Sequence, residues 1–301
     1  MSLQGWSLPL SPAGTAALVP PPPWHFSGEA LGVDFITDPA AVAAVLPAGI
    51  EPSGDGSASF VFGDWSSSAE RDPRLAADPA RGQYREAYVM VYGRLDGRDI
   101  AWLPYIWVDN DLSIARGLIQ GSPKKAGSIA MSRAVRIGRG GPRLEAGATF
   151  AGHASSLGRR LASGSVTLDG PADGYCPRAL CLPVWHTRLV PDLAGTEPLV
   201  YDLAHNFVSD FAVADIWRGQ AAQLTFHDSP FEELALLAPH EITGGFHCAA
   251  AFTIDGAETR PAGGSLFPAS GSRHVPRPEP PPWLEHCGRW CRWRATRWRP
   301  K

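Results

Sequence analysis

Apolar and polar residues alternate with a period of two along much of this chain, which is the pattern of half-buried β-strands. The alternation is clear in 57–65 and in two runs, 84–95 and 99–108, that are joined by Asp96 and Gly97. An Asp-Gly pair between two such runs favours a tight hairpin turn. Further strands are predicted near 128–137, 144–151, 159–168, 183–190, 221–227 and 241–254.

Three short segments have helix signals instead. An Asp-Pro pair opens the alanine-rich stretch 38–46, and an Asn-Asp pair opens 110–118. The segment 229–237 begins with a capping box, in which Glu232 would bond back to the N–H of Ser229. With two or three short helices against about ten strands, we expect a mainly β (α+β) fold built from antiparallel sheet or a barrel.

Composition divides the chain into three parts. Residues 1–23 end in four prolines and form an extended, Pro-rich lead to the domain. The domain is expected over 24–256, and it includes a polar loop at about 66–83. The stretch 257–301 is rich in Pro, Gly, Arg and Trp, and we expect it to be a disordered tail without a part in the chemistry. An arm for an acidic surface or single-stranded nucleic acid is the alternative.

Charge is distributed unevenly along the chain. The formal net charge is -3, but 273–301 carry seven Arg and one Lys against two Glu, which leaves -9 for the rest. A mildly acidic body predicts no nucleic-acid partner. No run approaches the roughly 20 apolar residues of a membrane helix. The N-terminal stretch has no basic region and is interrupted by Pro9 and Pro12, so we expect no signal peptide, no membrane partner and a cytoplasmic location.

Cysteines and histidines give little support to a metal or cofactor. Five cysteines are an odd and sparse set, which predicts no disulfide framework. Cys287 and Cys291 beside His286 have ligand chemistry, but no second pair has matching spacing. The other histidines are scattered, and the glycines of 138–141 lack the spacing of a dinucleotide site. We therefore predict neither a metal nor a cofactor.

Almost all of the positively charged residues are arginines: the chain has 24 Arg and three Lys. Two of the lysines, Lys124 and Lys125, are adjacent. A guanidinium that stays protonated above about pH 12 cannot act as a nucleophile, whereas an amine can. A free lysine is about 99.9% protonated at pH 7, so its pKa must fall before it can attack a ketone. The sequence around the pair is apolar and contains no carboxylate, so burial is the expected cause. A solvated pair in a turn is the alternative.

Strand geometry predicts that the two lysines point to opposite faces, and it identifies Glu86 as a candidate catalytic carboxylate. Adjacent residues of an extended segment point to opposite faces, so the amine of Lys125 need not contact that of Lys124. In 84–92 the alternation places Glu86 on one face with three tyrosines and a methionine. A carboxylate among apolar neighbours is costly unless it is paired or protonated, so Glu86 is a candidate general acid or base. A solvated glutamate on an edge strand is the alternative.

These residues, with their order along the chain, resemble the acetoacetate decarboxylase superfamily over about residues 20–256. The resemblance rests on five segments, of which the Pro-Lys-Lys segment is the most specific. They are Pro21-Pro22-Pro23-Trp24, Tyr84-Arg85-Glu86-Ala87, Val108-Asp109-Asn110, Gly121-Ser122-Pro123-Lys124-Lys125-Ala126-Gly127, and Ile216-Trp217-Arg218-Gly219 with Leu224-Thr225-Phe226.

The resemblance implies a fold of antiparallel sheets around a cone-shaped barrel, assembled as a homo-oligomer. It also implies that Lys124 forms a Schiff base with a small keto acid and that Lys125 helps to depress its pKa. Glu86 matches the active-site glutamate of the family. The iminium would then act as an electron sink for loss of CO2 or of a proton from a neighbouring carbon.

Departures from the family pattern divide the functional interpretation. Decarboxylases of the family carry an arginine where this chain has Ser27, Gly28 or Glu29, and a second glutamate where it has Val61. An aldolase-dehydratase subgroup, which condenses pyruvate with aldehydes, carries a glutamine four residues before the lysine, as Gln120 stands here. Its tyrosine in the last strand corresponds to Phe252, which, with Gln120 and Arg116, completes our predicted substrate-binding residues.

Three functions follow from these observations. The first is a Schiff-base lyase that performs aldol and dehydration chemistry on pyruvate or a related α-keto acid. The second is decarboxylation of acetoacetate or a bulkier β-keto acid, with the substrate carboxylate held by Arg116. The third is a non-catalytic protein that binds a small molecule. A lysine that is protonated at neutral pH would favour the third function.

Overall fold

The computed structural model describes residues 2–193 and 197–263, so the C-terminal stretch predicted as a tail lies outside the described residues, apart from its first seven positions. The elements follow one another as β1 (Trp24–Ile36), α1 (Pro39–Ala44), β2 (Glu51–Pro52), β3 (Ser57–Ala69), α2 (Arg74–Ala77), α3 (Pro79–Gly82), β4 (Gln83–Leu95), β5 (Arg98–Val108), α4 (Asp111–Gln120), β6 (Lys124–Ala126), β7 (Ser128–Met131), β8 (Thr149–Ser156), β9 (Arg159–Thr167), β10 (Gly170–Pro171), α5 (Arg178–Cys181), β11 (Val184–Val190), β12 (Val200–Gly219), β13 (Ala222–Phe226), the 3-10 helix η1 (Leu234–Leu237) and β14 (Glu241–Pro261).

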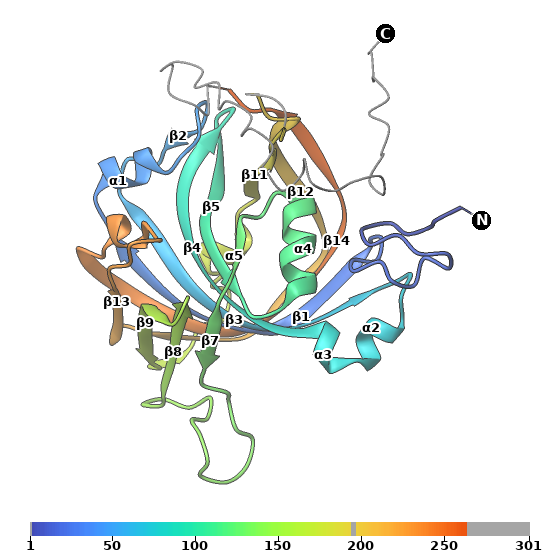
Figure 1. Ribbon diagram of the computed structural model, residues 1–301. Coiled ribbons are helices and arrows are strands. Elements are labelled where there is room, and N and C mark those ends of the chain that lie inside the picture. The colour runs from blue at the N-terminus through green and yellow to red at the C-terminus, as the bar shows by residue number, and fades with distance from the viewer. Residues whose placement is uncertain (1, 194–196, 264–301) are drawn as a thin grey trace, which may run out of the picture. The chain divides into compact units, whose positions relative to one another are not determined.

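Seven strands close into a ring in the order β4-β3-β1-β14-β12-β11-β5, because β5 also pairs with β4 (Figure 1). Most neighbours in this ring are antiparallel, whereas β5 pairs with β11 and β6 in parallel. A second sheet, in the order β13-β9-β8-β7, lies against the outside of the ring. The mainly β prediction and its barrel are confirmed, although residues 2–193 and 197–263 contain five α-helices where the sequence predicted two or three.

Between the two sheets lies the largest hydrophobic cluster. Phe60 and Phe62 of β3 pack there against Phe150 and Leu161 of the second sheet. The sheets approach closely at Gly152, where a Cβ would lie 2.7 Å from the ring of Phe62. This packing leaves the interior of the ring to separate clusters, and the cavity described below lies among them.

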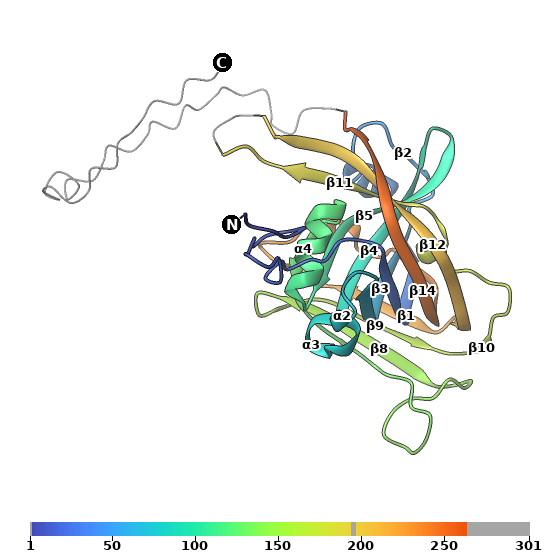
Figure 2. The ribbon, with the colours of Figure 1, turned by 90° about the vertical axis from the view of Figure 1, so that its right-hand side faces the viewer.

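The predicted hairpin and two of the helices form where their signals lie. Asp96 and Gly97 both adopt positive φ between β4 and β5, as a type I′ turn requires. The side chain of Asp38 caps α1, and Asn110 caps α4 by accepting a hydrogen bond from the N–H of Ser113. The helix α4 lies within the curve of the ring and packs against β6 and β11 (Figures 1 and 2).

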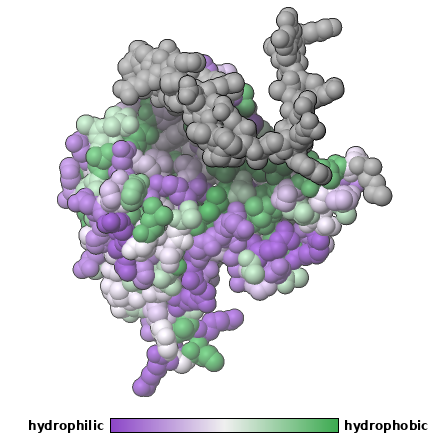
Figure 3. Space-filling view, viewed as in Figure 1, coloured by the Kyte–Doolittle hydropathy of each residue, from purple (hydrophilic) through white to green (hydrophobic). Residues whose placement is uncertain are grey.

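Several segments differ from the sequence prediction. No strand was predicted over β1, and the strand expected at 144–151 is found as β8, Thr149–Ser156. The polar loop before β4 contains two short helices, α2 and α3, in a region where hydrophilic residues gather on the face of Figure 3. The expected strand at 128–137 ends at Met131, and the chain then forms a long projecting loop before β8 (Figure 1). The strand β12 was not predicted, because register shifts with Asp210 and Asp215 at positive φ interrupt its alternation.

No described helix is long and apolar enough to cross a membrane. The N-terminal stretch packs on the domain. The ring of Trp6 meets that of Trp24 edge to face at 5.6 Å. The hydroxyl of Ser7 accepts a hydrogen bond from the N–H of Val19. The domain boundaries drawn from composition stay predictions.

Candidate active site

A cavity of about 430 Å³ lies inside the ring, which is the size of a small-molecule site. Its walls are mostly apolar, with residues from α4, α5, β6 and the ring strands. A few polar side chains interrupt these walls, among them Tyr84, Glu86, Gln120, Ser122, Lys124 and His186. The predicted Lys124, Glu86, Gln120 and Phe252 thus meet in one cavity, although Glu86 and Phe252 are far from the other two in sequence.

Strand β5 brings Lys124 and Glu86 together. Lys124 of β6 lies opposite Ile106, and Glu86 of β4 lies opposite Val108. Because Ile106 and Val108 are two residues apart, their partners face the same side of the sheet. The Lys124 Nζ donates a hydrogen bond to Glu86 Oε2 at 2.9 Å, and only 8% of the lysine side chain is exposed. The pair is therefore a nearly buried amine and carboxylate at the wall of a cavity.

One face of α4 covers the amine. Ser113, Arg116, Gly117 and Gln120 recur at the three- and four-residue spacing that places side chains along one face of a helix. The hydroxyl of Ser113 accepts a second hydrogen bond from the Lys124 Nζ at 2.9 Å. A Cβ at Gly117 would lie 2.8 Å from the lysine stem, so the helix approaches as closely as it does because this residue is glycine.

Burial lowers the pKa of Lys124 from its ordinary value. The negative charge of Glu86 opposes this shift, and the positive charge of Arg116 adds to it. The sequence near the lysines contains no carboxylate, but the fold supplies one from β4. The neighbouring cation that lowers the pKa of Lys124 is Arg116, the role that the family resemblance gave to Lys125.

Arg116 is almost completely buried, with 1% of its surface exposed, and no described carboxylate pairs with it. Its guanidinium lies 4.5 Å from the ring centroid of Phe26 and makes long hydrogen bonds of 3.4 Å to Ser67 and Tyr84. Phe26 and Tyr84 line the cavity, whereas Arg116 lies behind them. Its predicted contact with a substrate carboxylate stays a prediction.

Lys125 faces away from the cavity. Its Nζ pairs with the Oε2 of Glu232 and lies 5.6 Å from the ring centroid of Trp107, the residue opposite Lys125 in β5. Glu232 also accepts a hydrogen bond from Trp107 Nε1 at 3.0 Å. The predicted capping box is therefore wrong, because Glu232 binds these two side chains instead of the N–H of Ser229. The expected helix at 229–237 is reduced to η1.

Packing limits the side chains that fit at two of the positions that depart from the decarboxylase pattern, Val61 of β3 and Gly28 of β1. Val61 is fully buried and packs with Tyr88, so no carboxylate stands at this position. A Cβ at Gly28 would collide with the carbonyl of Asp64, which leaves no room for an arginine side chain. Phe252 lines the cavity and stacks on Phe26 with ring centroids 4.7 Å apart.

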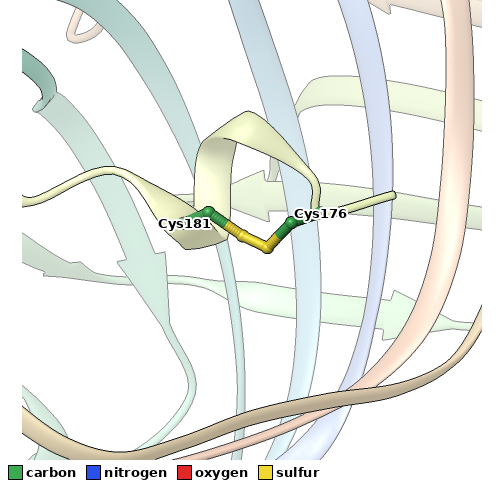
Figure 4. Close-up of a disulfide and its surroundings, with 2 residues drawn as sticks. All are labelled: Cys176 and Cys181. Atoms are coloured by element: carbon green, nitrogen blue, oxygen red, sulfur yellow. A yellow bond between two sulfur atoms is a disulfide. The ribbon is translucent and has the colours of Figure 1, made fainter. Parts of the chain in front are cut away.

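The short helix α5 forms another part of the cavity wall. A disulfide joins Cys176 and Cys181 across it, with their Cα atoms 6.2 Å apart (Figure 4). Cys181 lines the cavity, and Arg178 of the same turn lies over the ring of Tyr92. The sequence predicted no disulfide framework, and the pairing found here is local, within one helical turn. Cys287 and Cys291 lie outside the described residues.

Three further side chains of the site were not predicted. Ser113 could have been found by counting back from Gln120 along one helix face, because the two are seven residues apart. Ser122 lies within the Pro-Lys-Lys segment itself. His186 had no sequence signal, because β11 reaches the cavity only through pairings between distant strands. In the described part of the chain, no group of three His, Cys, Asp or Glu could hold a metal ion.

Comparison with known proteins places the chain in a family. The chain belongs to the acetoacetate decarboxylase family, whose model matches residues 7–260. The structure of MppR, an enduracididine biosynthesis enzyme complexed with the condensation product of pyruvate and imidazole 4-carboxaldehyde, is 38% identical to it with a TM-score of 0.81. The match covers 86% of this chain and 97% of MppR.

Two other solved structures extend the comparison. An acetoacetate decarboxylase-like enzyme from Sphingomonas wittichii RW1 is 30% identical with a TM-score of 0.77, over 85% of this chain and all of that one. The acetoacetate decarboxylase of Legionella pneumophila is 20% identical with a TM-score of 0.70, over 87% and 98% of the two chains, and shows the fold alone. A search of curated protein sequences finds no match.

Proposed function

We propose that this protein is a Schiff-base lyase that condenses pyruvate or a related α-keto acid with an aldehyde and then removes water. The observation that carries the proposal is the buried amine of Lys124, whose pKa is lowered and which contacts the carboxylate of Glu86 in a cavity. A neutral amine in an apolar site is a nucleophile for a ketone. Glu86 lies within reach of a proton on the bound substrate.

The chemistry follows from these two groups. The amine of Lys124 attacks the keto carbon, the hydroxyl group of the resulting carbinolamine takes a proton from solvent and leaves as water, and an iminium forms. Glu86 takes a proton from the neighbouring carbon, which leaves an enamine. The enamine carbon bonds to the aldehyde carbon, and the new alkoxide takes the proton from Glu86. Loss of a second proton and of the hydroxyl group as water gives an unsaturated iminium, and its hydrolysis releases the unsaturated keto acid and frees Lys124.

The amide of Gln120 is suited to the substrate carboxylate. Its Nε2 is buried and has no hydrogen-bond partner among the described residues, and the side chain lines the cavity. An unpaired buried donor is costly, so an anionic acceptor at this position would stabilise the complex. Arg116, behind Tyr84, adds positive charge on the same side of the site.

Condensation is favoured over decarboxylation by the departures from the decarboxylase pattern, by the size of the cavity and by the relatives. The positions that carry an arginine and a second glutamate in decarboxylases are occupied by Gly28 and Val61, or their neighbours. Pyruvate would fill a small part of the 430 Å³, which leaves room for a second substrate. MppR, at 37% identity, has been solved with pyruvate bound. The homo-oligomer and the cytoplasmic location stay predictions.

Trapping of the Schiff base tests the proposal. The protein is incubated with pyruvate or with acetoacetate, reduced with borohydride, and the adduct is located by mass. We expect a pyruvate adduct on Lys124, and no adduct in Lys124→Arg although this variant keeps its fold. With an aldehyde present, a conjugated product is expected instead of CO2. Release of CO2 from acetoacetate at a higher rate would assign the decarboxylase function, and no adduct with either acid would assign a binding protein.

A further inference from the structure

A second set of polar groups lines the cavity apart from Glu86 and Gln120. It includes Ser122, His186 and Asn206. His186 is 7% exposed, and its Nδ1 lies 3.4 Å from Ser122 Oγ. The structure records no partner for His186 Nε2, or for the side chain of Asn206, among the described residues. Polar side chains that line an apolar cavity without partners are available to a ligand.

The fold holds His186 next to the lysine segment. Gly121, in the left-handed conformation at φ 96°, ends α4 against β11, where its Cβ would lie 3.1 Å from the backbone nitrogen of Arg188. Ser122 follows, and its carbonyl accepts a hydrogen bond from the N–H of Lys124 at 2.8 Å. One turn therefore positions both the amine and the hydroxyl that contacts the imidazole.

The register of β11 and β12 brings Asn206 to the same side. His186 lies opposite Ala204, and Asn206 is two residues beyond Ala204. Side chains two residues apart share a face of the sheet, as do those of paired residues. His205, between them, is also among the residues around the cavity, but its ring stacks on Trp185 with ring centroids 5.2 Å apart.

The imidazole is neutral at physiological pH. Burial is the main cause that lowers the pKa of His186 to about 3. A neutral imidazole carries one proton. When Nδ1 accepts a hydrogen bond from the Ser122 hydroxyl, the single proton of the imidazole is on Nε2. Nε2 then serves as a hydrogen-bond donor.

We propose that His186 is a second catalytic residue, whose Nε2–H donates a hydrogen bond to the carbonyl oxygen of an apolar or aromatic aldehyde while the enamine on Lys124 attacks it. The inference rests on the proposed function and assigns the class of the second substrate. As the new C–C bond forms, the electron pair of the C=O bond moves to the oxygen. His186 stabilises that alkoxide and keeps its own proton, while the proton held by Glu86 passes to the oxygen.

Apart from Ser122, His186 and Asn206, the side chains named below line the second-substrate region with apolar surface, which sets the aldehyde class. Leu103, Ile106, Leu182 and Val184 line the cavity on the strands and the α5 segment around His186. These side chains have no polar group for a charged or hydroxylated substituent. An aromatic ring fits this surface and buries area that is favourable to remove from water.

Two variants of one residue test the proposal. The amide nitrogen of Asn reaches the position of Nδ1, whereas that of Gln reaches the position of Nε2. With pyruvate and benzaldehyde, we expect His186→Asn to lower kcat/KM for benzaldehyde about 100-fold, the loss typical of one donor to a developing oxyanion. His186→Gln is expected to retain most of the activity. Absorbance of the conjugated product measures the reaction.

Trapping of pyruvate without aldehyde separates this inference from the proposed function. All variants should form the borohydride-stable adduct at the rate of the unmodified protein, which also shows that they are folded. The exposed His240→Asn is the matched control and should keep full activity. Unchanged kcat/KM in His186→Asn, or equal losses in the Asn and Gln variants, would overturn the role of His186. Failure of the unmodified protein to form the adduct would overturn both proposals, whereas an adduct that forms but does not condense with benzaldehyde would overturn the present inference alone.

Ser122 is a positioning residue in this scheme. Removing its hydroxyl in Ser122→Ala leaves the imidazole free to place its proton on Nδ1, which lowers kcat for condensation. The KM for pyruvate should not change, because Ser122 acts on the aldehyde through His186. Ser122→Thr keeps the hydroxyl and should restore kcat, and a loss of pyruvate trapping in Ser122→Ala would contradict this assignment.

Discussion

The two sides of β6 place two adjacent lysines in different surroundings. On the inner side, Lys124 is 8% exposed, faces an apolar cavity and has a lowered pKa. On the outer side, 45% of the Lys125 side chain is exposed, and its ammonium pairs with Glu232. Each lysine contacts one carboxylate, so the presence of a counter-charge does not distinguish them. Desolvation does.

The second difference between the two sides is the neighbouring cation. Arg116 lies behind the inner side and disfavours a charged amine at Lys124, whereas on the outer side the pair of Lys125 and Glu232 is held by Trp107. Strand β5 determines this division, because Ile106 faces the cavity and Trp107 faces outward. Alternation along two paired strands therefore turns one of two identical residues into a candidate nucleophile and the other into an anchor.

Exchange of the inner carboxylate should have the largest effect. Glu86→Gln removes the proton acceptor, so we expect condensation to fall about 10²- to 10⁴-fold, the range for general acid–base catalysis. Glu86 raises the pKa of Lys124, so its removal lowers that pKa further and leaves more neutral amine. Trapping of pyruvate should therefore persist while turnover fails. Mass analysis after borohydride, beside the rate of product formation, measures both.

The matched control is the outer carboxylate. Glu232→Gln keeps an acceptor for Trp107 and should leave both trapping and turnover close to those of the unmodified protein. If Glu86→Gln lost the adduct as well, the carboxylate would be needed for amine attack and not for the later proton transfer. Equal effects of the two substitutions would remove the distinction between the inner and outer sides.

Removal of the inner cation should move the pH profile. Arg116→Met keeps an apolar side chain under Phe26 and removes a positive charge that lowers the pKa of Lys124. The amine attacks only when neutral, so adduct formation rises with pH through the pKa of Lys124. Because that pKa rises in the variant, the profile should shift to higher pH and trapping at neutral pH should fall. The rate of trapping between pH 5 and 10 checks this.

An exposed arginine serves as the control for net charge. Arg133→Met removes a cation from a side chain that is largely exposed and paired with Asp64. Its profile should coincide with that of the unmodified protein. A profile that stays in place in Arg116→Met would show that desolvation alone lowers the pKa of Lys124.

Local signals predicted much of this fold. The turn at Asp96 and Gly97, the capped starts of α1 and α4, and the face shared by Tyr84, Glu86 and Tyr88 depend on residues close together in sequence. The opposite directions of Lys124 and Lys125 follow from strand geometry alone. The proximity of Lys124 and Glu86 was expected from the family resemblance, and the register of β5 is its physical reason.

The remaining features depend on contacts between distant segments. Glu232 had the spacing of a capping box, but an ion pair with Lys125 and a hydrogen bond from Trp107 compete for its carboxylate. Bulges in β12 interrupt its alternation of apolar and polar residues, so the sequence did not show which face of the sheet Asn206 occupies. His186 reaches the cavity only because β11 pairs with β12 and β5. No local pattern encodes such pairings.

Removal of the outer charge should have the smallest effect, and it tests the comparison most directly. In Lys125→Met the amine of Lys124 keeps its burial, Glu86 and Arg116, so its pH profile of pyruvate trapping should not move. Stability should fall by about 1 kcal/mol, because the nearly buried carboxylate of Glu232 loses one of its two partners. In the double variant with Glu232→Gln, the losses should be less than additive, as expected for side chains in contact. Urea unfolding measures the stability, and trapping against pH measures the profile. A shift of the Lys125→Met profile to higher pH would show that the outer ammonium also depresses the pKa of Lys124, as the family resemblance implies, and the two sides of β6 would then act as one site.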